Sequence, residues 1–380
     1  MRFVFVTGEY PPTEGGVGDY SAHLGRALLG LGHSVVVLTS VGGGSTAGDE
    51  DGIKVLREVA GWGRGEIDAV ARRVASLEPD VVNFQYVPHL YGRGGVAPGA
   101  ALLPAAIARH SAAVVLTTMH ELFAPLPLNP RRLLASLLQR LQLRVLLRSS
   151  TVLVATNPGY ARRLTRRAPG RRVHQIPVGS NIEPPTQPGD SAAVRAGIGA
   201  TGSVIGDLSP AAVSKRPLDL VTVLAGADPS TRLLLVGGLR DQADSQRRVA
   251  EAARSAGVED RVHATGYLAP AEVSRHLGAI DVCVHTAAAG ASSRSGTLAA
   301  ALGHGLPVVG YHGPETPEFL SSSAGLVLVP AGDTRALTSA VTGLLVSPER
   351  RREAAAAAGE TYRLHLTWDG IARQVVEAAR

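Results

Sequence analysis

The chain has 380 residues, of which 45% are hydrophobic, 18% charged and 4% aromatic, and its formal net charge is +6. This length exceeds what one hydrophobic core supports, so two domains are expected, and the composition excludes a disordered chain. No apolar run approaches the roughly 18 residues that would indicate a transmembrane helix, and one cysteine, Cys283, excludes an intramolecular disulfide and a thiolate zinc site. The first apolar run is too short for a signal peptide, so a cytoplasmic location is expected.

Short apolar runs alternate with helical segments through the first half of the chain. Near-continuous Val and Leu runs of this kind indicate a parallel sheet covered by helices on both faces. We expect strands at 2–7, 34–39, 80–85, 112–118 and 151–155. We expect helices at 18–31, 67–77, 99–109 and 131–148. A turn-rich stretch at 177–189 then interrupts the pattern and reads as a linker between domains.

The second half repeats the alternation. We expect its strands at 203–205, 232–236, 262–264, 282–285, 308–310 and 326–329, and its helices at 216–225, 243–256, 271–277 and 297–303. The predicted fold class is α/β, with two doubly wound Rossmann-like domains that face across a cleft and bind ligands at strand carboxyl ends. The expected domains are 1–182 and 183–365, with a C-terminal helix, 366–380, packing back on the first.

The stretch from Gly290 to Gly310 contains a loop of small hydroxylated residues around Arg294, followed by an Ala/Leu run. A helix that begins in such a loop offers unpaired N–H groups and the positive end of its dipole to an anion, above all a phosphate. The alternative is an ordinary N-capped helix packed on a sheet.

Glycines also follow the first expected strand, at Gly15, Gly16 and Gly18. Glycines between a strand and a helix let the backbone approach a ligand closely. Their spacing is not Gly-x-Gly-x-x-Gly, and no acidic residue follows at the distance that would hold a ribose, so a nicotinamide site is weakly supported. A merely structural loop is the alternative.

Charge is unevenly distributed. Between Arg131 and Arg172 lie eleven arginines and no acidic residue. One interpretation is a solvated face of two helices, because arginine stems cover apolar surface well. The other is contact with an anionic membrane or acceptor. Nucleic acid is not expected, because no aromatic residues are interleaved for base stacking. An acidic run, Asp49-Glu50-Asp51, superficially matches a metal-binding motif but is predicted to be a solvated turn.

Several motifs in a fixed order resemble those of retaining glycosyltransferases of the GT-B fold, in the large family-four group. They are Pro-Pro-x-x-Gly-Gly-x-Gly at 11–18, His120 at a strand end, Pro-Val-Gly-Ser-Asn at 177–181, Lys215 before Arg-Pro, Gly-Tyr-Leu at 266–268, and Gly-Leu-Pro-Val-Val at 305–309. The resemblance covers nearly the whole chain and implies a donor nucleotide-sugar bound mainly by the second domain, without a metal or other cofactor.

The resemblance also implies roles for individual residues. His120, Lys215 and Arg294 would form the catalytic set, with Lys215 at the diphosphate and His120 beside the donor sugar. A packed strand-end histidine is the alternative for His120. Donor binding would further involve Gly15, Gly16, Gly266, Tyr267, Leu268, Ser292, Ser293, Ser295, Gly296, Thr297 and Leu298. Acceptor binding would fall to the 86–96 loop and to Glu9, Tyr10, Tyr20, Asn83, Gln85 and Tyr86.

Two positions depart from the family pattern. The family's Glu-x7-Glu pair falls on Ser292 and Ala300, and the arginine that often accompanies the lysine falls on Asp207. The sequence around Arg294 resembles that of a family branch in which Ser, Arg and Gly replace the glutamates. We therefore infer that Arg294 supplies the positive charge missing at 207.

The predicted reaction moves a sugar from a UDP- or GDP-linked donor to a small-molecule or cell-envelope acceptor. The family is thought to retain configuration by front-face departure of the diphosphate, for which the protein supplies electrostatic stabilisation and alignment. Inversion would need a base, for which Glu9 and Asp19 are candidates. A nucleotide-sugar epimerase and a non-catalytic sugar-nucleotide-binding relative remain alternatives.

Overall fold

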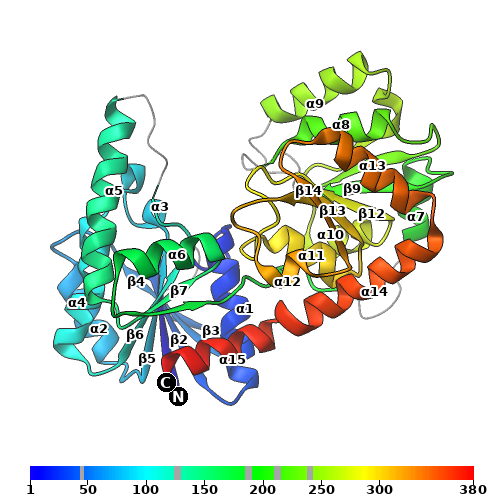
Figure 1. Cartoon of the computed structure of the whole chain (residues 1–380). Coiled ribbons are helices and arrows are strands. Elements are labelled where there is room, and N and C mark those ends of the chain that lie inside the picture. The colour runs from blue at the N-terminus through cyan, green and yellow to red at the C-terminus, as the bar shows by residue number, and fades with distance from the viewer. Residues whose placement is uncertain (43–46, 124–129, 185–190, 209–214, 238–242) are drawn as a thin grey trace. The chain divides into compact units, whose positions relative to one another are not determined.

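The computed structural model describes residues 1–42, 47–123, 130–184, 191–208, 215–237 and 243–380. They divide into two compact units, Met1–Pro177 with Trp368–Arg380, and Val178–Thr367 (Figure 1). The second unit begins a few residues before the predicted boundary at 182/183, because the Val178 amide already donates to Ser293 O, at 2.8 Å, inside that unit.

Among the described residues, the first unit has an eight-stranded sheet in the order β3-β4-β2-β1-β5-β6-β7-β8. Neighbouring strands pair in parallel, except β3 with β4. The strands are β1 (Arg2–Thr7), β2 (Ser34–Ser40), β3 (Ala47–Glu50), β4 (Ile53–Val59), β5 (Val81–Tyr86), β6 (Val114–Met119), β7 (Val152–Ala155) and β8 (Arg172–Gln175). The five strands expected in this half are all present, and β3, β4 and β8 are additional.

Helices cover both faces of this sheet, as Figure 1 shows. The helix α15 packs against α1, whereas α4 packs against α2 and α5. The helical segments are α1 (Gly16–Gly30), α2 (Ile67–Ala75), α3 (Pro88–Tyr91), η1 (Arg93–Gly95), α4 (Pro98–His110), α5 (Pro130–Ser149), α6 (Pro158–Arg167) and α15 (Trp368–Ala379). The core between sheet and helices contains Val4, Phe84, Leu103, Leu146 and Leu164.

The second unit has, over its described residues, an all-parallel six-stranded sheet in the order β11-β10-β9-β12-β13-β14. Its strands are β9 (Val204–Leu208), β10 (Arg232–Val236), β11 (Val262–Ala264), β12 (Val282–His285), β13 (Val308–His312) and β14 (Leu326–Pro330). Each overlaps the strand expected there. From β9 the chain adds β10 and β11 on one side of the sheet, and it then adds β12, β13 and β14 on the other side. The point between β9 and β12 where the strand order reverses is the switch point at which such sheets bind ligands.

Two apolar layers cover the two faces of this second sheet. The helices α8, α9 and α13 contribute to one buried cluster, and α7, α10, α11, α12 and α14 contribute to the other. The helical segments are α7 (Ser191–Gly197), α8 (Pro217–Ala225), α9 (Ala243–Ser255), η2 (Glu259–Arg261), α10 (Pro270–Leu277), α11 (Gly296–Gly303), α12 (Glu318–Ser321), α13 (Thr334–Leu345) and α14 (Pro348–His365).

The acidic run at 49–51 is not the solvated turn that the sequence predicted. Asp49 and Glu50 belong to β3, an edge strand antiparallel to β4. Glu50 Oε1 accepts a hydrogen bond at 2.7 Å from Arg57, whose side chain is 3% exposed. A buried guanidinium needs a counter-ion, which gives this carboxylate a structural role. Only Asp51 lies in the turn.

Gly206 in β9 provides a test of packing at the centre of the second sheet. A Cβ placed there would lie 2.6 Å from Leu234 O and 2.5 Å from Ile280 Cδ1. We expect Gly206→Ala to lower the free energy of unfolding by about 1–3 kcal/mol, because the rigid β10 backbone has to shift. At Gly359 in α14 an added Cβ would meet open space, so Gly359→Ala should stabilise by about 0.5–1 kcal/mol. Urea unfolding of both variants tests this, and equal effects would contradict it.

Candidate functional site

In the first unit, His120 follows β6 directly and contacts residues from two other elements, β5 and α1. Its Nε2 lies 2.8 Å from Gln85 Oε1 on β5. The Tyr20 ring of α1 meets the imidazole edge-on at 4.7 Å, and Tyr20 in turn packs against Trp368 of α15 at 5.3 Å. The predicted C-terminal helix therefore supports the ring that orients His120.

The surroundings of His120 keep its ring uncharged. Burial lowers the pKa of His120 to about 4, since removing water disfavours the imidazolium. With Gln85 Oε1 as the acceptor, Nε2 carries the proton and Nδ1 is left with the lone pair. A neutral imidazole in this tautomer can accept a hydrogen bond from a sugar hydroxyl.

Glu9 interacts with the start of α1. Its Oε1 accepts hydrogen bonds from the Val17 and Gly18 amides at 2.9 and 3.0 Å. A Cβ on Gly15 would meet this carboxylate, so a larger residue there would have to displace the Glu9 side chain. The carboxylate thus occupies the anion position at the helix N-terminus that sequence reasoning gave to phosphates held by Gly15 and Gly16.

Most of the predicted acceptor residues are buried within the first unit. Tyr86 is fully buried, and its hydroxyl accepts a hydrogen bond from Gln142 Nε2 at 3.2 Å. Asn83 is also fully buried and accepts from Thr118 Oγ1 at 2.9 Å. Tyr10, Tyr20 and Gln85 are buried as well. These side chains shape the strand ends from inside, and in this structure they have almost no surface for an acceptor; Glu9 retains some exposure.

In the second unit, the loop before α11 has the predicted polar character. Ser295 is the N-cap of α11, and its Oγ accepts from the Leu298 amide at 3.2 Å. Gly296 and Thr297 form the first turn, in which helix amides have no intrahelical acceptor. Arg294 precedes the cap, and its Nε lies 3.2 Å from Glu315 Oε2. These four residues are partly exposed and present donors on one loop.

The remaining donor residues predicted on this loop lie beneath it. Ser292 and Ser293 are 6% and 2% exposed, and Leu298 belongs to the core cluster on the α11 side of the sheet. Ala300 is fully buried in the same cluster. The side chains at both positions where sequence reasoning placed the family's glutamates are therefore buried.

The Lys215 ammonium lies at the carboxyl end of β9, and the side chain is only 4% exposed. Its Nζ donates to Asp207 Oδ1 at 2.6 Å and to Leu208 O at 2.5 Å. A hollow of about 250 Å³ beside it is lined also by Arg216, Pro217, Leu218, Asp219 and Arg248. Both cations predicted for the donor site, Lys215 and Arg294, thus have a carboxylate partner.

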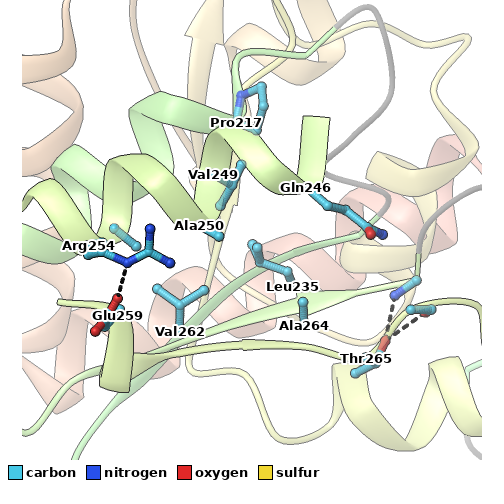
Figure 2. A pocket seen from close by; sticks show the side chains of 13 residues that line it. Pro217, Leu235, Gln246, Val249, Ala250, Arg254, Glu259, Val262, Ala264 and Thr265 are labelled. Carbon is cyan, nitrogen blue, oxygen red and sulfur yellow. Dashed lines mark hydrogen bonds and ion pairs between the residues drawn. The ribbon is translucent and has the colours of Figure 1, made fainter. Parts of the chain in front are cut away.

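The Gly266–Leu268 segment follows β11 and borders a pocket of about 490 Å³. Gly266 adopts φ +69°, which favours glycine, and Tyr267 is 54% exposed. Figure 2 shows the pocket between α9 and strands β10 and β11, with the Arg254–Glu259 ion pair at one end and Thr265 at the other. Apolar side chains line its middle: Leu235, Val249, Ala250, Ala253, Val262 and Ala264. Such a pocket suits the ring of a nucleobase.

Sequence reasoning did not find Glu315 or the Asp207–Lys215 pair. Glu315 follows β13, and no spacing rule connects it with Arg294. Asp207 was noted only as a departure from a family motif. Its pairing with Lys215 is a tertiary contact, which the sequence does not reveal. The described residues contain no group of three or more His, Cys, Asp or Glu side chains that could hold a metal ion.

The depressed pKa of His120 predicts a pH-dependent stability. An unfolded histidine titrates near 6.5, so between pH 6.5 and 4 the unfolded state binds more protons and stability falls as pH falls. At pH 5 this costs about 2 kcal/mol relative to pH 7. We expect His120→Gln to lose less stability than wild type over that interval, measured by urea unfolding at both pH values. Identical pH dependence in the two proteins would contradict the assignment.

Comparisons with known proteins place these observations in a family. The model for glycosyl transferases group 1 matches residues 206–347, and the glycosyl transferase 4-like domain model matches residues 15–179. The 2-deoxystreptamine N-acetyl-D-glucosaminyltransferase of Streptomyces fradiae is 34% identical over 113 residues, which are 30% of this chain and 26% of that protein. The chain thus matches about a quarter of this relative's length.

Solved structures match nearly the entire chain. Sucrose-phosphate synthase from Thermosynechococcus elongatus has a TM-score of 0.73 and 18% identity, and covers 99% of this chain and 98% of its own. HepE of Anabaena in complex with UDP-glucose also has a TM-score of 0.73 and 18% identity, with 99% of this chain and 98% of that chain covered. A trehalose-phosphate synthase from Burkholderia xenovorans, bound to glucose-6-phosphate, has a TM-score of 0.70 and 12% identity, with complete coverage of both chains. The fold is that of GT-B glycosyltransferases, and the chain belongs to the glycosyl transferases of group 1.

Proposed function

We propose that this transferase moves a sugar from a UDP- or GDP-linked donor to a small-molecule or cell-envelope acceptor, with retention of configuration. The observation that carries the proposal is the loop before α11, where Arg294 stands beside the first-turn amides of Gly296 and Thr297. Backbone donors, a helix dipole and a guanidinium together favour a diphosphate. The bound UDP-glucose of HepE and the glycosyltransferase name of the Streptomyces relative agree with such a donor.

In the proposed reaction, the glycosidic bond to the diphosphate breaks as the acceptor hydroxyl approaches the same face of the sugar. The protein stabilises negative charge on the leaving diphosphate through Lys215, Arg294 and the α11 amides. Fixed cations can do this without a metal, so none is proposed. Neutral His120 accepts a hydrogen bond from a donor-sugar hydroxyl through Nδ1 and aligns the ring.

We propose that the acceptor meets loops rather than strand interiors. Asn83, Gln85 and Tyr86 are fully buried, so they hold the loops in place from below. Glu9 and the 86–96 segment follow β1 and β5 at the carboxyl edge of the first sheet. Acceptor identity commonly varies in such strand-end loops.

Incubation of the protein with a panel of nucleotide-sugars, with and without candidate acceptors, tests the proposal. We expect release of UDP or GDP, because slow donor hydrolysis accompanies transfer. Arg294→Ala should weaken nucleotide binding by about tenfold, since a charge-assisted hydrogen bond contributes roughly 1.5 kcal/mol. Glu315→Gln is the matched control, and it should bind nucleotide at least as tightly as wild type.

Two outcomes would overturn this proposal. Interconversion of sugars without nucleotide release would indicate an epimerase. Nucleotide binding that raises the melting temperature, with no turnover for any acceptor, would indicate a binding protein. Unchanged nucleotide affinity in Arg294→Ala would remove that residue from the donor site.

We also propose that the first unit docks on the anionic face of a cytoplasmic membrane through α5 and α6. Four leucines on α5 are between 40% and 59% exposed, and their spacing of three, one and three residues puts them on one helix face: Leu134, Leu137, Leu138 and Leu141. An exposed stripe of this kind is costly in water, and no helix among the described residues is long and apolar enough to cross a membrane. A helix that lies in the bilayer interface buries such a stripe without crossing the membrane.

Charge selects an anionic lipid surface as the occupant of this stripe. Exposed Arg144 and Arg148 continue α5 beyond the leucines, and α6 adds four exposed or partly exposed arginines within a stretch that has no acidic residue. A hollow of about 200 Å³ between α4 and α5 opens beside Leu138 and Leu141 and is lined mainly by apolar residues. Each arginine near such a surface contributes about 1 kcal/mol.

Flotation with phosphatidylglycerol-containing and pure phosphatidylcholine vesicles tests this docking. We expect binding only to the anionic vesicles, weakened by salt, because the arginines supply attraction and the leucines insertion. Leu137→Ser with Leu141→Ser should reduce binding by at least about tenfold. Leu364→Ser on α14 is the matched control, because Leu364 is 57% exposed but lies in the second unit. Equal binding by both variants, or a concentration-dependent dimer lost in the double variant, would contradict membrane docking.

A further inference from the structure

Two chain segments fix the position of Lys215. The Arg216 amide donates to Thr286 O at 2.9 Å, and Lys215 forms an isolated antiparallel bridge with Ala287. At the end of the side chain, Nζ lies 2.6 Å from Asp207 Oδ1 and 2.5 Å from Leu208 O. The ammonium is therefore held at the carboxyl end of β9 by its own backbone and by its acceptors.

Among the described charged groups near this ammonium, Asp207 contacts it directly. Arg216 pairs with Asp219 at 2.7 Å, and both line the neighbouring hollow together with Arg248. Asp207 is 1% exposed; burial raises its pKa, and the Lys215 ammonium works against that rise. His285 Nδ1 lies 3.9 Å from Asp207 Oδ1, and burial together with Lys215 holds the pKa of His285 well below its usual range. Burial likewise raises the pKa of the Cys283 thiol. The imidazole and the thiol are thus uncharged, and among the described side chains of this cluster Asp207 alone balances Lys215.

The cluster retains unused hydrogen-bonding capacity. Among the described residues, three buried atoms of this cluster have no partner: Asp207 Oδ2, His285 Nε2 and Thr286 Oγ1. An ammonium has three N–H groups, of which Asp207 and Leu208 accept two. Buried polar groups are rarely left unpaired. The third ammonium N–H group and the Thr286 hydroxyl can donate to an anion, whereas Asp207 Oδ2 can only accept.

We propose that Asp207 is a positioning residue for the donor site: it keeps the buried Lys215 charged and aims its third N–H group at the donor diphosphate. The inference rests on the proposed function, in which Lys215 binds that diphosphate. A carboxylate at 207 then acts through the lysine, where the family pattern has an arginine that would meet phosphate itself. Without the carboxylate, the buried ammonium would lose its counter-ion and would release its proton at a lower pH.

Nucleotide affinity measured against pH tests this role. UDP and GDP would be titrated calorimetrically into wild type and Asp207→Asn between about pH 6 and 9.5, and the ratio of the two dissociation constants followed. We expect the affinity of Asp207→Asn to fall relative to that of wild type as pH rises, by up to about tenfold per pH unit once the ammonium that lacks its counter-ion begins to lose its proton. The ratio should therefore rise by at least about tenfold from pH 7 to pH 9.

Two control variants separate this effect from general damage. Asp260→Asn changes an exposed carboxyl in the same unit and should leave the ratio near one at every pH. Lys215→Met removes the charge itself, so it should bind nucleotide weakly without the added pH slope. If Asp207→Asn loses its thermal transition, Asp207→Glu replaces it: the longer carboxylate keeps the charge but displaces Nζ, so affinity should fall severalfold with a constant ratio.

A constant ratio near one for Asp207→Asn, or wild-type affinity in Asp207→Glu, would overturn the positioning role. Failure of wild type to bind either nucleotide at any pH would instead overturn the proposed function. The two failures are therefore distinguishable in one set of titrations.

Discussion

The parallel pairing of β9 with β10 and β12 is the constraint on which the candidate donor site depends. In a parallel sheet every strand ends at the same edge, so the loops that follow these strands must converge there. The chain uses this edge for Asp207 near the end of β9 and Lys215 after it, for Gly266 after β11 and for Arg294 after β12. Residues that are far apart in sequence thus share one edge.

Opposite charge or dipole compensates each strong charge at these edges. Glu9 caps α1, Asp207 pairs with Lys215, and Glu315 pairs with Arg294. A charge removed from water without such a partner would cost several kcal/mol. Pairing with a carboxylate therefore allows Lys215 and Arg294 to remain charged in sheltered positions without a bound ligand. It also means that a diphosphate gains less from net charge than from the directions in which N–H groups point.

Alternation of apolar runs and helical segments was enough to predict two parallel α/β domains, because strands buried on both faces, such as Val152–Ala155, read as continuous apolar runs. The sequence did not predict the hairpin β3–β4, because its Gly-rich surroundings and three acidic residues resemble a turn. The buried partner of Glu50, Arg57, is what makes the edge strand acceptable, and this pairing is a tertiary fact. Short strand β8, half exposed at the other edge, gave little pattern to detect.

The candidate site was predictable in its location but less so in its contacts. The Ser295 cap and the α11 start follow from local sequence rules, as does the left-handed Gly266. Exposure does not follow from such rules. Sequence reasoning treated Tyr86 and Ser292 as ligand contacts, yet Tyr86 is buried against Gln142 of α5 and Ser292 is only 6% exposed.

Burial also bears on the two positions where sequence reasoning placed the family's glutamates, Ser292 and Ala300. Ala300 lies wholly within the core cluster beside Leu302, so a carboxylate there would be buried without a partner, at a cost of several kcal/mol. The helix α11 is thus packed through a position that the family pattern gives to a polar contact. Carboxylates instead reach this part of the second unit from β9 and from the segment after β13, and each arrives beside a cation. In this chain the acidic groups therefore come from β9 and from the segment after β13, and each one pairs with one of the chain's own cations.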